Sequence, residues 1–494
     1  MRILETESIS LQELRLLPRH TPADAGMAHV SLRTRLCALG NGHLELGLPV
    51  LSAAMQAVSG PDLAIALAQL GGIGVLPLSQ SIDAQCQAAA QVKRYKAGFQ
   101  TDIVTLSPAQ RLSEVVSLMR ATGFATFPVT DTGLFHGRLL GVLTDKDFDP
   151  RGDGAARVAD RMRKDVQVGV ETHDLNAANQ LMIDYGRGFL PIVSEAGTLL
   201  SVVFKKDRDK HLHHPDETVD SDRRLRIAAA VSTHPEDRER TEALLEQEVD
   251  VLVIDASDGH TAFQAEMIEW VKAIGDVPVV AGNVVTAEGF DFLADAGADA
   301  VKVGMGVGSG CTTQSLKATG RGQATALMDV AAARERRRQA GGRDLPLIAD
   351  GGLAGPAAIV VALALGADSV MLGNLLARFS ESPGQLVRGH RGELFKEYWM
   401  EGSKRAANTR RYAHATRDFF EEGVEGLVPH AGSIFDGVPV LERALRSALA
   451  TAGCTTLRAL HRGALLERQS PASLGDSAVH DLELAPTRAA ASGG

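Results

Sequence analysis

A short glycine-rich stretch, residues 304–313, contains the side chain best suited to nucleophilic chemistry, Cys311. Four glycines fall within the seven residues before the cysteine, so the backbone can adopt positive φ and approach a ligand or ion closely. Carbonyls of such a loop can ligate a monovalent cation, its amides can bind phosphate, and a thiol among them can act as a nucleophile. Taken alone, the stretch also fits a flexible surface loop with an incidental cysteine. The rest of the chain favours the first interpretation.

Further groups of small or polar residues follow apolar, strand-like segments. In a parallel α/β barrel the carboxyl ends of the strands meet on one face, so residues that follow them line a common pocket. Glycine and aspartate also end strands for local reasons, but that explanation fits one or two such groups better than five. With the cysteine loop, the groups are 255–259 (Asp-Ala-Ser-Asp-Gly), 282–283 (Gly-Asn), 304–311, 350–352 (Asp-Gly-Gly) and 373–374 (Gly-Asn).

The elements that must position these groups are eight apolar segments that alternate with helical patterns. Near-continuous apolar strands predict a parallel sheet covered on its faces, and eight such units suggest an α/β fold, a (β/α)₈ TIM barrel. A doubly wound open sheet has the same alternation and is the alternative. The strands are expected at 48–55, 72–78, 225–232, 250–257, 277–284, 298–305, 345–352 and 367–374. The helices are expected at 61–70, 237–248, 262–275, 287–297, 323–339 and 355–366.

Composition limits the class of protein. At 494 residues the chain exceeds the size of a single core, so two or more domains are expected. A net charge of −10 argues against a general binder of nucleic acids or anionic membranes. The N-terminus is acidic without the apolar core of a signal peptide, and the longest apolar window, 357–372, is too short for the ~20 residues of a membrane span. Four widely spaced cysteines without a CxxC pair disfavour a disulfide scaffold or structural zinc. A cytoplasmic protein is expected.

An insertion at residues 100–212 contains an internal repeat. Phe127-Pro128-Val129 recurs as Leu190-Pro191-Ile192, and an amphipathic helix is expected before each copy, at 112–122 and 175–185. The expected domains are therefore 1–99 and 213–494, which form the barrel, and 100–212, an α+β module. The polar, glycine-punctuated region 380–437 is too long for a connector and suggests a lid or binding flap.

Together these features resemble the inosine monophosphate (IMP) dehydrogenase family, roughly over residues 8–484, and the insertion resembles that family's tandem CBS (Bateman) module. The motifs that carry the resemblance are Ser309-Gly310-Cys311-Thr312-Thr313, Ala349-Asp350-Gly351-Gly352, Met371-Leu372-Gly373, Glu397-Tyr398, Arg411-Tyr412 and Glu422-Gly423-Val424-Glu425-Gly426. The chain departs from the family pattern at Gln56, at Asn374 and at 399–401.

The resemblance implies NAD-dependent oxidation of IMP to XMP, the committed step toward guanine nucleotides. Cys311 would attack C2 of the base, hydride would leave to the nicotinamide, and the covalent thioimidate, E-XMP, would then be hydrolysed. Arg411 and Tyr412 match the residues that activate water in the second step. Because free arginine is a poor base, this role requires either a neutral guanidine or a proton relay through Thr313, and both alternatives stay open.

The resemblance also assigns binding residues. Those for the substrate are Met55, Ser309, Asp350, Gly352, Gly373, Asn374, Tyr398, Gly402 and Glu422, and those for NAD are Asp255, Ser257, Asn283 and Gly304. Potassium would be bound by carbonyls of Gly306, Gly308 and Cys311, with Asp476, Ser477 and Ala478 from a neighbouring subunit of a homotetramer, which could pair into an octamer. In the insertion, Thr144 and Asp147 fit an ATP or GTP site. The alternative for the insertion is a pair of purely structural modules.

Two other functions are compatible with parts of this pattern. GMP reductase, an NADPH-dependent deaminase, has the same barrel and cysteine loop, but Arg411-Tyr412 argues against it because its intermediate is not hydrolysed. A barrel without catalytic activity that senses nucleotides is the second alternative. The presence of Cys311, Asp350 and Arg411 together argues against that loss of activity.

Overall fold

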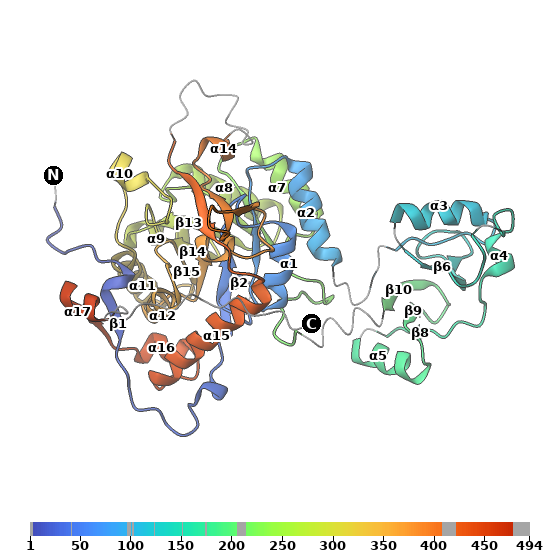
Figure 1. Cartoon of the computed structure of the whole chain (residues 1–494), viewed down its shortest axis with the longest axis horizontal. Helices are drawn as coiled ribbons and strands as arrows, with labels where there is room; N and C mark the ends of the chain where they lie inside the picture. Colours follow the sequence, from blue (N-terminus) through green and yellow to red (C-terminus); the bar gives the residue numbers. More distant parts are fainter. Residues whose placement is uncertain are drawn as a thin grey trace. The chain divides into compact units, whose positions relative to one another are not determined.

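The computed structural model describes residues 3–40, 42–95, 100, 103–122, 124–150, 152–172, 175–204, 214–407 and 421–477. The chain forms two compact units (Figure 1). The first comprises Met1–Ala89 and Ile227–Gly494, and the second comprises Ala90–Arg226. Each unit is described separately below.

The first unit contains an eight-stranded parallel sheet in the order β4-β16-β15-β14-β13-β12-β11-β5. A parallel bridge from Leu51 to Ile73 joins β4 to the residue before β5 and closes the ring. The predicted barrel is therefore confirmed, and the open doubly wound alternative is wrong. The strands are β4 (Val50–Ser52), β5 (Gly74–Leu76), β11 (Ile227–Val231), β12 (Val251–Ile254), β13 (Val279–Val284), β14 (Ala300–Val303), β15 (Leu347–Asp350) and β16 (Ser369–Leu372).

Helices surround these strands, as Figure 1 shows. The side chains of Thr261 and Thr286 cap two of them by accepting backbone N–H bonds, and proline occupies the first turn of α1 and α12, where its missing N–H costs no helical bond. The helices are α1 (Pro61–Gln69), α2 (Ile82–Arg94), α7 (Asp237–Glu246), α8 (Ala262–Ile274), α9 (Ala287–Asp295), α11 (Gln323–Gln339), α12 (Pro356–Ala364), α15 (Ile434–Thr451) and α16 (Leu457–Gly463).

The region after β16, predicted to be a lid or binding flap, is described in part. Its described part forms a three-stranded antiparallel sheet of β17 (Leu386–Arg388), β18 (Leu394–Trp399) and β19 (Glu425–Pro429). Most residues of β17 and β19 are exposed, which explains why no apolar run predicted them. The short helices α10 (Thr313–Lys317), α13 (Asn374–Ala377), α14 (Lys404–Ala407) and α17 (Pro471–Asp476), the hairpin β2 (Thr34–Leu39)–β3 (Gly42–Leu46) and the pair β1 (Leu14–Leu16)–β20 (Leu466–Arg468) complete the unit.

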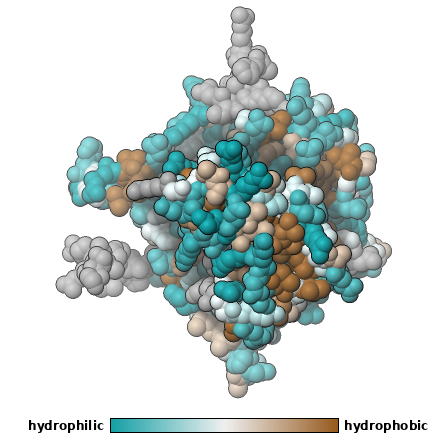
Figure 2. Space-filling view, turned by 90° about the vertical axis from the view of Figure 1, so that its right-hand side faces the viewer, coloured by the Kyte–Doolittle hydropathy of each residue, from teal (hydrophilic) through white to brown (hydrophobic). Residues whose placement is uncertain are grey.

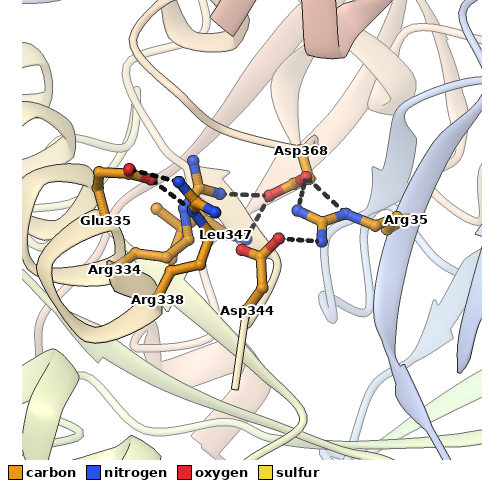
Figure 3. A network of polar contacts seen from close by, with 7 residues as sticks. All are labelled: Arg35, Arg334, Glu335, Arg338, Asp344, Leu347 and Asp368. Atoms are coloured by element: carbon orange, nitrogen blue, oxygen red, sulfur yellow. Dashed lines mark hydrogen bonds and ion pairs between the residues drawn. The ribbon is translucent and has the colours of Figure 1, made fainter. Parts of the chain in front are cut away.

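A buried ionic network lies where β15 and β16 begin (Figure 3). Asp368, with 3% of its side chain exposed, pairs with Arg35 at 2.9 Å and with Arg334 at 2.7 Å. Its carboxylate also accepts the N–H of Leu347 at 3.0 Å, and Arg35 pairs with Asp344 at 2.7 Å. One carboxylate therefore connects the β2–β3 hairpin, α11 and the starts of two barrel strands.

Two neighbours of this network differ in their exposure. Burial lowers the pKa of His461, which is neutral at pH 7 and lies 3.0 Å from the carbonyl of Ala367. Glu335 and Arg338 form a surface pair on α11 at 2.7 Å, and the hydrogen bond from Arg338 lowers the pKa of Glu335 to about 2. Solvent screens such exposed pairs, so this one contributes little to stability.

The second unit consists of two copies of one motif. In each copy a helix precedes an antiparallel hairpin: α3 (Leu112–Thr122) precedes β6 (Thr126–Thr130) and β7 (Leu139–Thr144), and α5 (Leu175–Asp184) precedes β9 (Phe189–Val193) and β10 (Leu199–Phe204). Each hairpin gains a parallel neighbour, by the bridge from Leu106 to Val129 in the first copy and by β8 (Gly169–Val170) in the second. The N–H groups of Leu139 and Leu199 donate to carbonyls of the other copy, so the two hairpins are joined. The short helix α4 (Val158–Arg161) lies between the copies in sequence.

Hydrophilic residues cover much of the face seen in Figure 2, with exposed hydrophobic residues between them. Within the described part of the chain, no helix combines the length and the apolar composition that crossing a bilayer requires. Single exposed hydrophobic residues are common on protein surfaces.

Candidate active site

Two adjoining cavities, of about 490 and 430 Å³, lie at the carboxyl ends of the barrel strands. Met55, Gly308, Asp350 and Met400 line both, so the two spaces meet beside the glycine-rich loop. Segments at the ends of seven of the eight strands contribute to the lining: β4, β11, β12, β13, β14, β15 and β16.

The cysteine loop, residues 304–313, follows β14 and is held against the segment before β19. The N–H of Cys311 donates to the carbonyl of Gly308 at 3.1 Å, and the N–H of Val424 donates to the carbonyl of Gly310, also at 3.1 Å. Gly304 has φ of 138°, and a Cβ there would collide with the carbonyl oxygen of Asp350. Only glycine fits this position, which lets β14 and β15 place the loop and the carboxylate side by side.

A chain of polar contacts leads from the thiol to a carboxylate. The Sγ of Cys311 lies 3.1 Å from the Oγ1 of Thr313, and this hydroxyl donates to Glu422 Oε2 at 2.9 Å. The other oxygen of Glu422 pairs with Lys317, one turn further along α10. Thr313 is 6% exposed, so the contact between the hydroxyl and the carboxylate is largely protected from water. The arrangement can carry a proton from the sulfur to Glu422.

A second polar cluster fixes the carboxylate of Asp350 at the end of β15. Its Oδ2 accepts from Lys302 Nζ and from Asn283 Nδ2, both at 3.0 Å. Asn283 also donates to the carbonyl of Gly304 at 2.6 Å and accepts from Lys302 through Oδ1. Lys302 is only 3% exposed and therefore brings its charge to Asp350 in a poorly hydrated place. With Oδ2 held by two donors, the other oxygen is available to a ligand in the cavities.

The 430 Å³ cavity extends from the cysteine loop toward the start of α13. Asn374 Nδ2 donates to Ser309 Oγ at 3.3 Å, and burial raises the pKa of Tyr398, which is therefore a neutral hydrogen-bond donor at pH 7. Gly352 and Gly373 leave the backbone accessible in the same lining. Amides and hydroxyls of this kind can bind a phosphate group.

On the side of β18, Met400 and Glu401 belong to the lining, and Gln56 and Trp399 lie behind Glu401 or beside it. Gln56 donates its backbone N–H to Glu401 Oε1 at 2.7 Å and accepts from Trp399 Nε1 at 3.0 Å. The guanidinium of Arg405 stacks 3.8 Å from the centre of the Trp399 ring, a cation–π contact. A Cβ on Gly402 would approach the carbonyl oxygen of Glu422 to 2.9 Å, so glycine is needed where these two segments meet.

The structure brings most of the predicted site residues together. Seventeen side chains or backbone groups that the sequence singled out line one cavity or the other: Met55, Asp255, Ser257, Asn283, Gly304, Gly306, Gly308, Ser309, Cys311, Thr313, Asp350, Gly352, Gly373, Asn374, Tyr398, Gly402 and Glu422. Asp476 and Ser477 line neither. Arg411, Tyr412 and Ala478 lie outside the described residues.

A lysine and an arginine of the lining, Lys302 and Arg378, were not predicted from the sequence. Lys302 lies within the apolar strand β14, where a single charged residue is itself unusual and could have been noticed. Arg378 lines the 430 Å³ cavity but follows α13 by sequence, and no motif or strand end marks it.

The second unit has a cavity of about 480 Å³ lined by residues of both copies. Thr144 lines it, and Asp147 Oδ2 accepts from the N–H and the hydroxyl of Thr144, at 2.6 and 2.7 Å. Arg163, a further lining residue, pairs with Asp147 at 3.0 Å. Asp147 itself is not part of the lining and holds Thr144 and Arg163 in place. Lys146 and Arg187 add positive charge to the lining.

Comparison with known proteins agrees with the predicted resemblance. Residues 8–480 match the family model of the IMP dehydrogenase / GMP reductase domain. Inosine-5'-monophosphate dehydrogenase from Tritrichomonas foetus is 38% identical over 483 residues, which cover 96% of each chain. That from Aquifex aeolicus is 38% identical over 451 residues, or 89% of this chain and 90% of the relative.

A solved structure extends the comparison to the fold. Residues of a GMP reductase variant from Trypanosoma brucei, crystallised with guanosine 5'-monophosphate, superpose with a TM-score of 0.86 at 28% identity, covering 97% of this chain and 98% of the other. Similarity of sequence and of fold thus extends over nearly the whole chain. The chain belongs to the IMP dehydrogenase / GMP reductase family.

Proposed function

We propose that the chain oxidises IMP to XMP with NAD through a covalent intermediate on Cys311. The observation that carries the proposal is the position of its Sγ, 3.1 Å from the Thr313 hydroxyl, in the lining of the cavity that also contains Asp350. Relatives that are 34% to 38% identical over most of the chain are IMP dehydrogenases, which favours oxidation of IMP over reduction of GMP.

The described residues suggest how a nucleotide would lie. Asp350 would accept the ribose hydroxyls with the oxygen that Lys302 and Asn283 leave available. The phosphate would lie at the other end, near Ser309 and Asn374. This orientation directs the base toward Cys311 and the wall that Met55, Gly402 and Glu422 form.

In the first step, the sulfur would form a bond to C2 of the base, the C2–H bond would break, and hydride would reduce NAD. The thiol proton is released, and the Thr313–Glu422 contact offers a path for it. In the second step, water would replace the sulfur at C2 and release XMP, which regenerates the thiol. Dividing one difficult substitution into two steps is the advantage of nucleophilic catalysis.

The same contact bears on the activation of water. Arg411 and Tyr412 remain proposed for this role on the basis of sequence. A proton relay through Thr313 would end at a definite acceptor, because the Thr313 hydroxyl already donates to the Glu422 carboxylate at 2.9 Å. A carboxylate is a better base than a guanidinium, whose pKa exceeds ~12.

The residues proposed for NAD and potassium fit these groups by their chemistry. Asp255 and Ser257 follow β12 and offer a carboxylate and a hydroxyl to a dinucleotide ribose, where NAD would supply the hydride acceptor. Asn283 instead uses its amide within the Asp350 cluster, so we assign it a positioning role. The carbonyls of Gly306, Gly308 and Cys311 belong to one loop, and carbonyl oxygens suit a monovalent cation, which would stiffen the segment that carries the thiol.

Asp476 and Ser477, at the end of α17, line neither cavity of their own chain, although Ser477 accepts a hydrogen bond from Arg15 at 3.0 Å. Because they lie outside these linings, they would complete a cation site from another copy, as the family resemblance implies. We therefore propose a homotetramer in which each subunit offers this segment to its neighbour.

The experiment that tests the function compares two reactions of the purified protein. With IMP and NAD, absorbance of the reduced nicotinamide should rise and XMP should form. With GMP and NADPH, the absorbance of the reduced nicotinamide should stay constant. Consumption of NADPH with GMP, together with no reaction of IMP, would establish the reductase instead, and inactivity with both pairs would favour a barrel without catalytic activity.

Replacing Lys302 by methionine should lower kcat/KM for IMP by about 10- to 100-fold, because hydrogen bonds to charged groups contribute roughly 1.5–3 kcal/mol and 1.36 kcal/mol corresponds to tenfold. The loss should appear mainly as a higher KM, since Lys302 acts through Asp350 rather than on the reacting atoms. Lys302→Arg keeps the charge and should retain most of the activity. An unchanged KM in a folded Lys302→Met protein would show that Asp350 needs no such support.

We also propose that the cavity of the second unit binds ATP or GTP and regulates the enzyme. Its support is the lysine and the two arginines among the lining residues, beside the Thr144 hydroxyl that Asp147 holds in place. Asp147→Ala should weaken nucleotide binding about tenfold or more, measured by calorimetry, because Thr144 and Arg163 lose their common partner. Asp184→Ala, on the outer part of α5, is the matched control. Equal affinities in the two variants would contradict the proposed site.

A further inference from the structure

The 430 Å³ cavity has an unusual balance of charge for a phosphate site. A phosphate monoester carries about −1.5 to −2 charges at pH 7. The residues that the family resemblance assigns to it, among them Ser309, Asn374 and Tyr398, are all neutral. Only two charged residues occur among the described residues of the lining, Asp350 and Arg378. Asp350 is acidic, so within the described part of this lining Arg378 is the only cation offered to a phosphate.

The guanidinium of Arg378 is directed back along α13 toward the start of that helix. Its Nε and Nη2 donate to Asn374 Oδ1 at 3.1 and 2.6 Å. The Asn374 amide is thereby oriented with Nδ2 toward Ser309, to which it donates at 3.3 Å. The carbonyl of Arg378 accepts from the N–H of Ala431 at 2.9 Å, which anchors its backbone.

These contacts would have a simple structural explanation if Arg378 only closed the end of α13. That explanation does not account for its place in the cavity lining. An arginine has five N–H donors, and those of Nε and Nη2 reach a single amide oxygen from one side. Donors therefore remain on a group that lies beside Ser309 and Asn374.

We propose that Arg378 is a specificity-determining residue for the substrate's 5'-phosphate, supplying positive charge to it and fixing the orientation of Asn374. The inference rests on the proposed function for one assumption, that the ligand is a purine nucleoside 5'-monophosphate. The arrangement selects for a phosphorylated nucleoside, because an uncharged 5'-hydroxyl gains nothing from the guanidinium. Arg378 touches no reacting atom and should act on binding.

The test uses the full-length protein and the variants Arg378→Met and Arg378→Lys. For Arg378→Met, the KM and the calorimetric Kd for IMP should each rise about 10- to 100-fold, the range expected when a charge-assisted hydrogen bond is lost. The kcat should change less than about threefold, and the Kd for inosine should stay within about twofold of the wild-type value. Arg378→Lys should bind IMP more tightly than Arg378→Met, since it keeps the charge.

Arg388→Met, on the exposed strand β17 outside both cavities, is the matched control and should behave like the wild type. Equal losses of affinity for IMP and inosine in Arg378→Met would mean a purely structural role and would overturn the proposal, as would an unchanged affinity for IMP. If the wild-type protein reduces GMP and does not oxidise IMP, the proposed function fails, but the same comparison with GMP and guanosine still decides the role of Arg378.

Discussion

Replacing Cys311 by alanine should reduce NADH formation from IMP by more than about 10⁴-fold, because none of the other three cysteines, all of them among the described residues, lines either cavity. IMP affinity should change only a few fold, since the Asp350 cluster and the lining near Ser309 stay intact. Cys86→Ala is the matched control. Burial raises the pKa of the Cys86 thiol, on α2, and it lines neither cavity, so this variant should keep full activity.

Mass spectrometry of acid-quenched wild-type enzyme provides the direct measurement for the same prediction. A nucleotide adduct should be found on the peptide that contains Cys311, and it should be missing from the alanine variant. NADH production by the Cys311→Ala protein at a rate close to that of the wild type would remove the nucleophile from the mechanism. An adduct found on another cysteine would do the same.

Asp368→Ala should lower the free energy of unfolding of the barrel unit by about 3–5 kcal/mol, the range observed when one member of a buried ion pair is removed. The substitution leaves Arg334 without the carboxylate that it contacts and deprives the Leu347 N–H of its acceptor. Both tryptophans of the chain, Trp270 and Trp399, belong to the barrel unit, so fluorescence during urea denaturation reports on this unit alone.

The exposed pair beside this network provides the comparison for that experiment (Figure 3). Glu335→Ala removes a carboxylate from the same helix, α11, but its partner Arg338 is solvated, so the midpoint of unfolding should not move measurably. A midpoint for Asp368→Ala that equals the midpoint of Glu335→Ala would show that the buried network adds nothing to stability.

The barrel could be predicted from the sequence because each of its strands is buried on both faces. Segments such as Ile227–Val231 and Val251–Ile254 are apolar throughout, and their residues are fully buried in the structure. The strand-end rule then located Asp350, Asn283 and the cysteine loop, since a parallel barrel leaves its strands' carboxyl ends on one face. The boundaries of α11 agree with the expected 323–339 to the residue.

Other features could not be read from the sequence because they depend on partners distant in the chain. Asp368 lies within the apolar window 357–372, where the sequence shows no partner for it. In the structure it is a buried ion-pair partner of Arg35, which lies more than 300 residues away in sequence. The sheet β17-β18-β19 has few buried residues, so it has no apolar period. Arg378 lines a cavity because it directly follows the single turn of α13. A helix of four residues is too short to show a hydrophobic period in the sequence.

The second unit lies in sequence between two strands that pair in the barrel, β5 and β11. These strands are neighbours in the barrel although about 150 residues separate them in sequence. Gln85, on α2 after β5, donates to the carbonyl of Ala230 on β11 at 2.9 Å and so links α2 to that strand. Loop-closure entropy grows slowly, by about 0.6 kcal/mol for each doubling of length. A connection of this length between β5 and β11 therefore costs the ring of strands only slightly more than a short connector would.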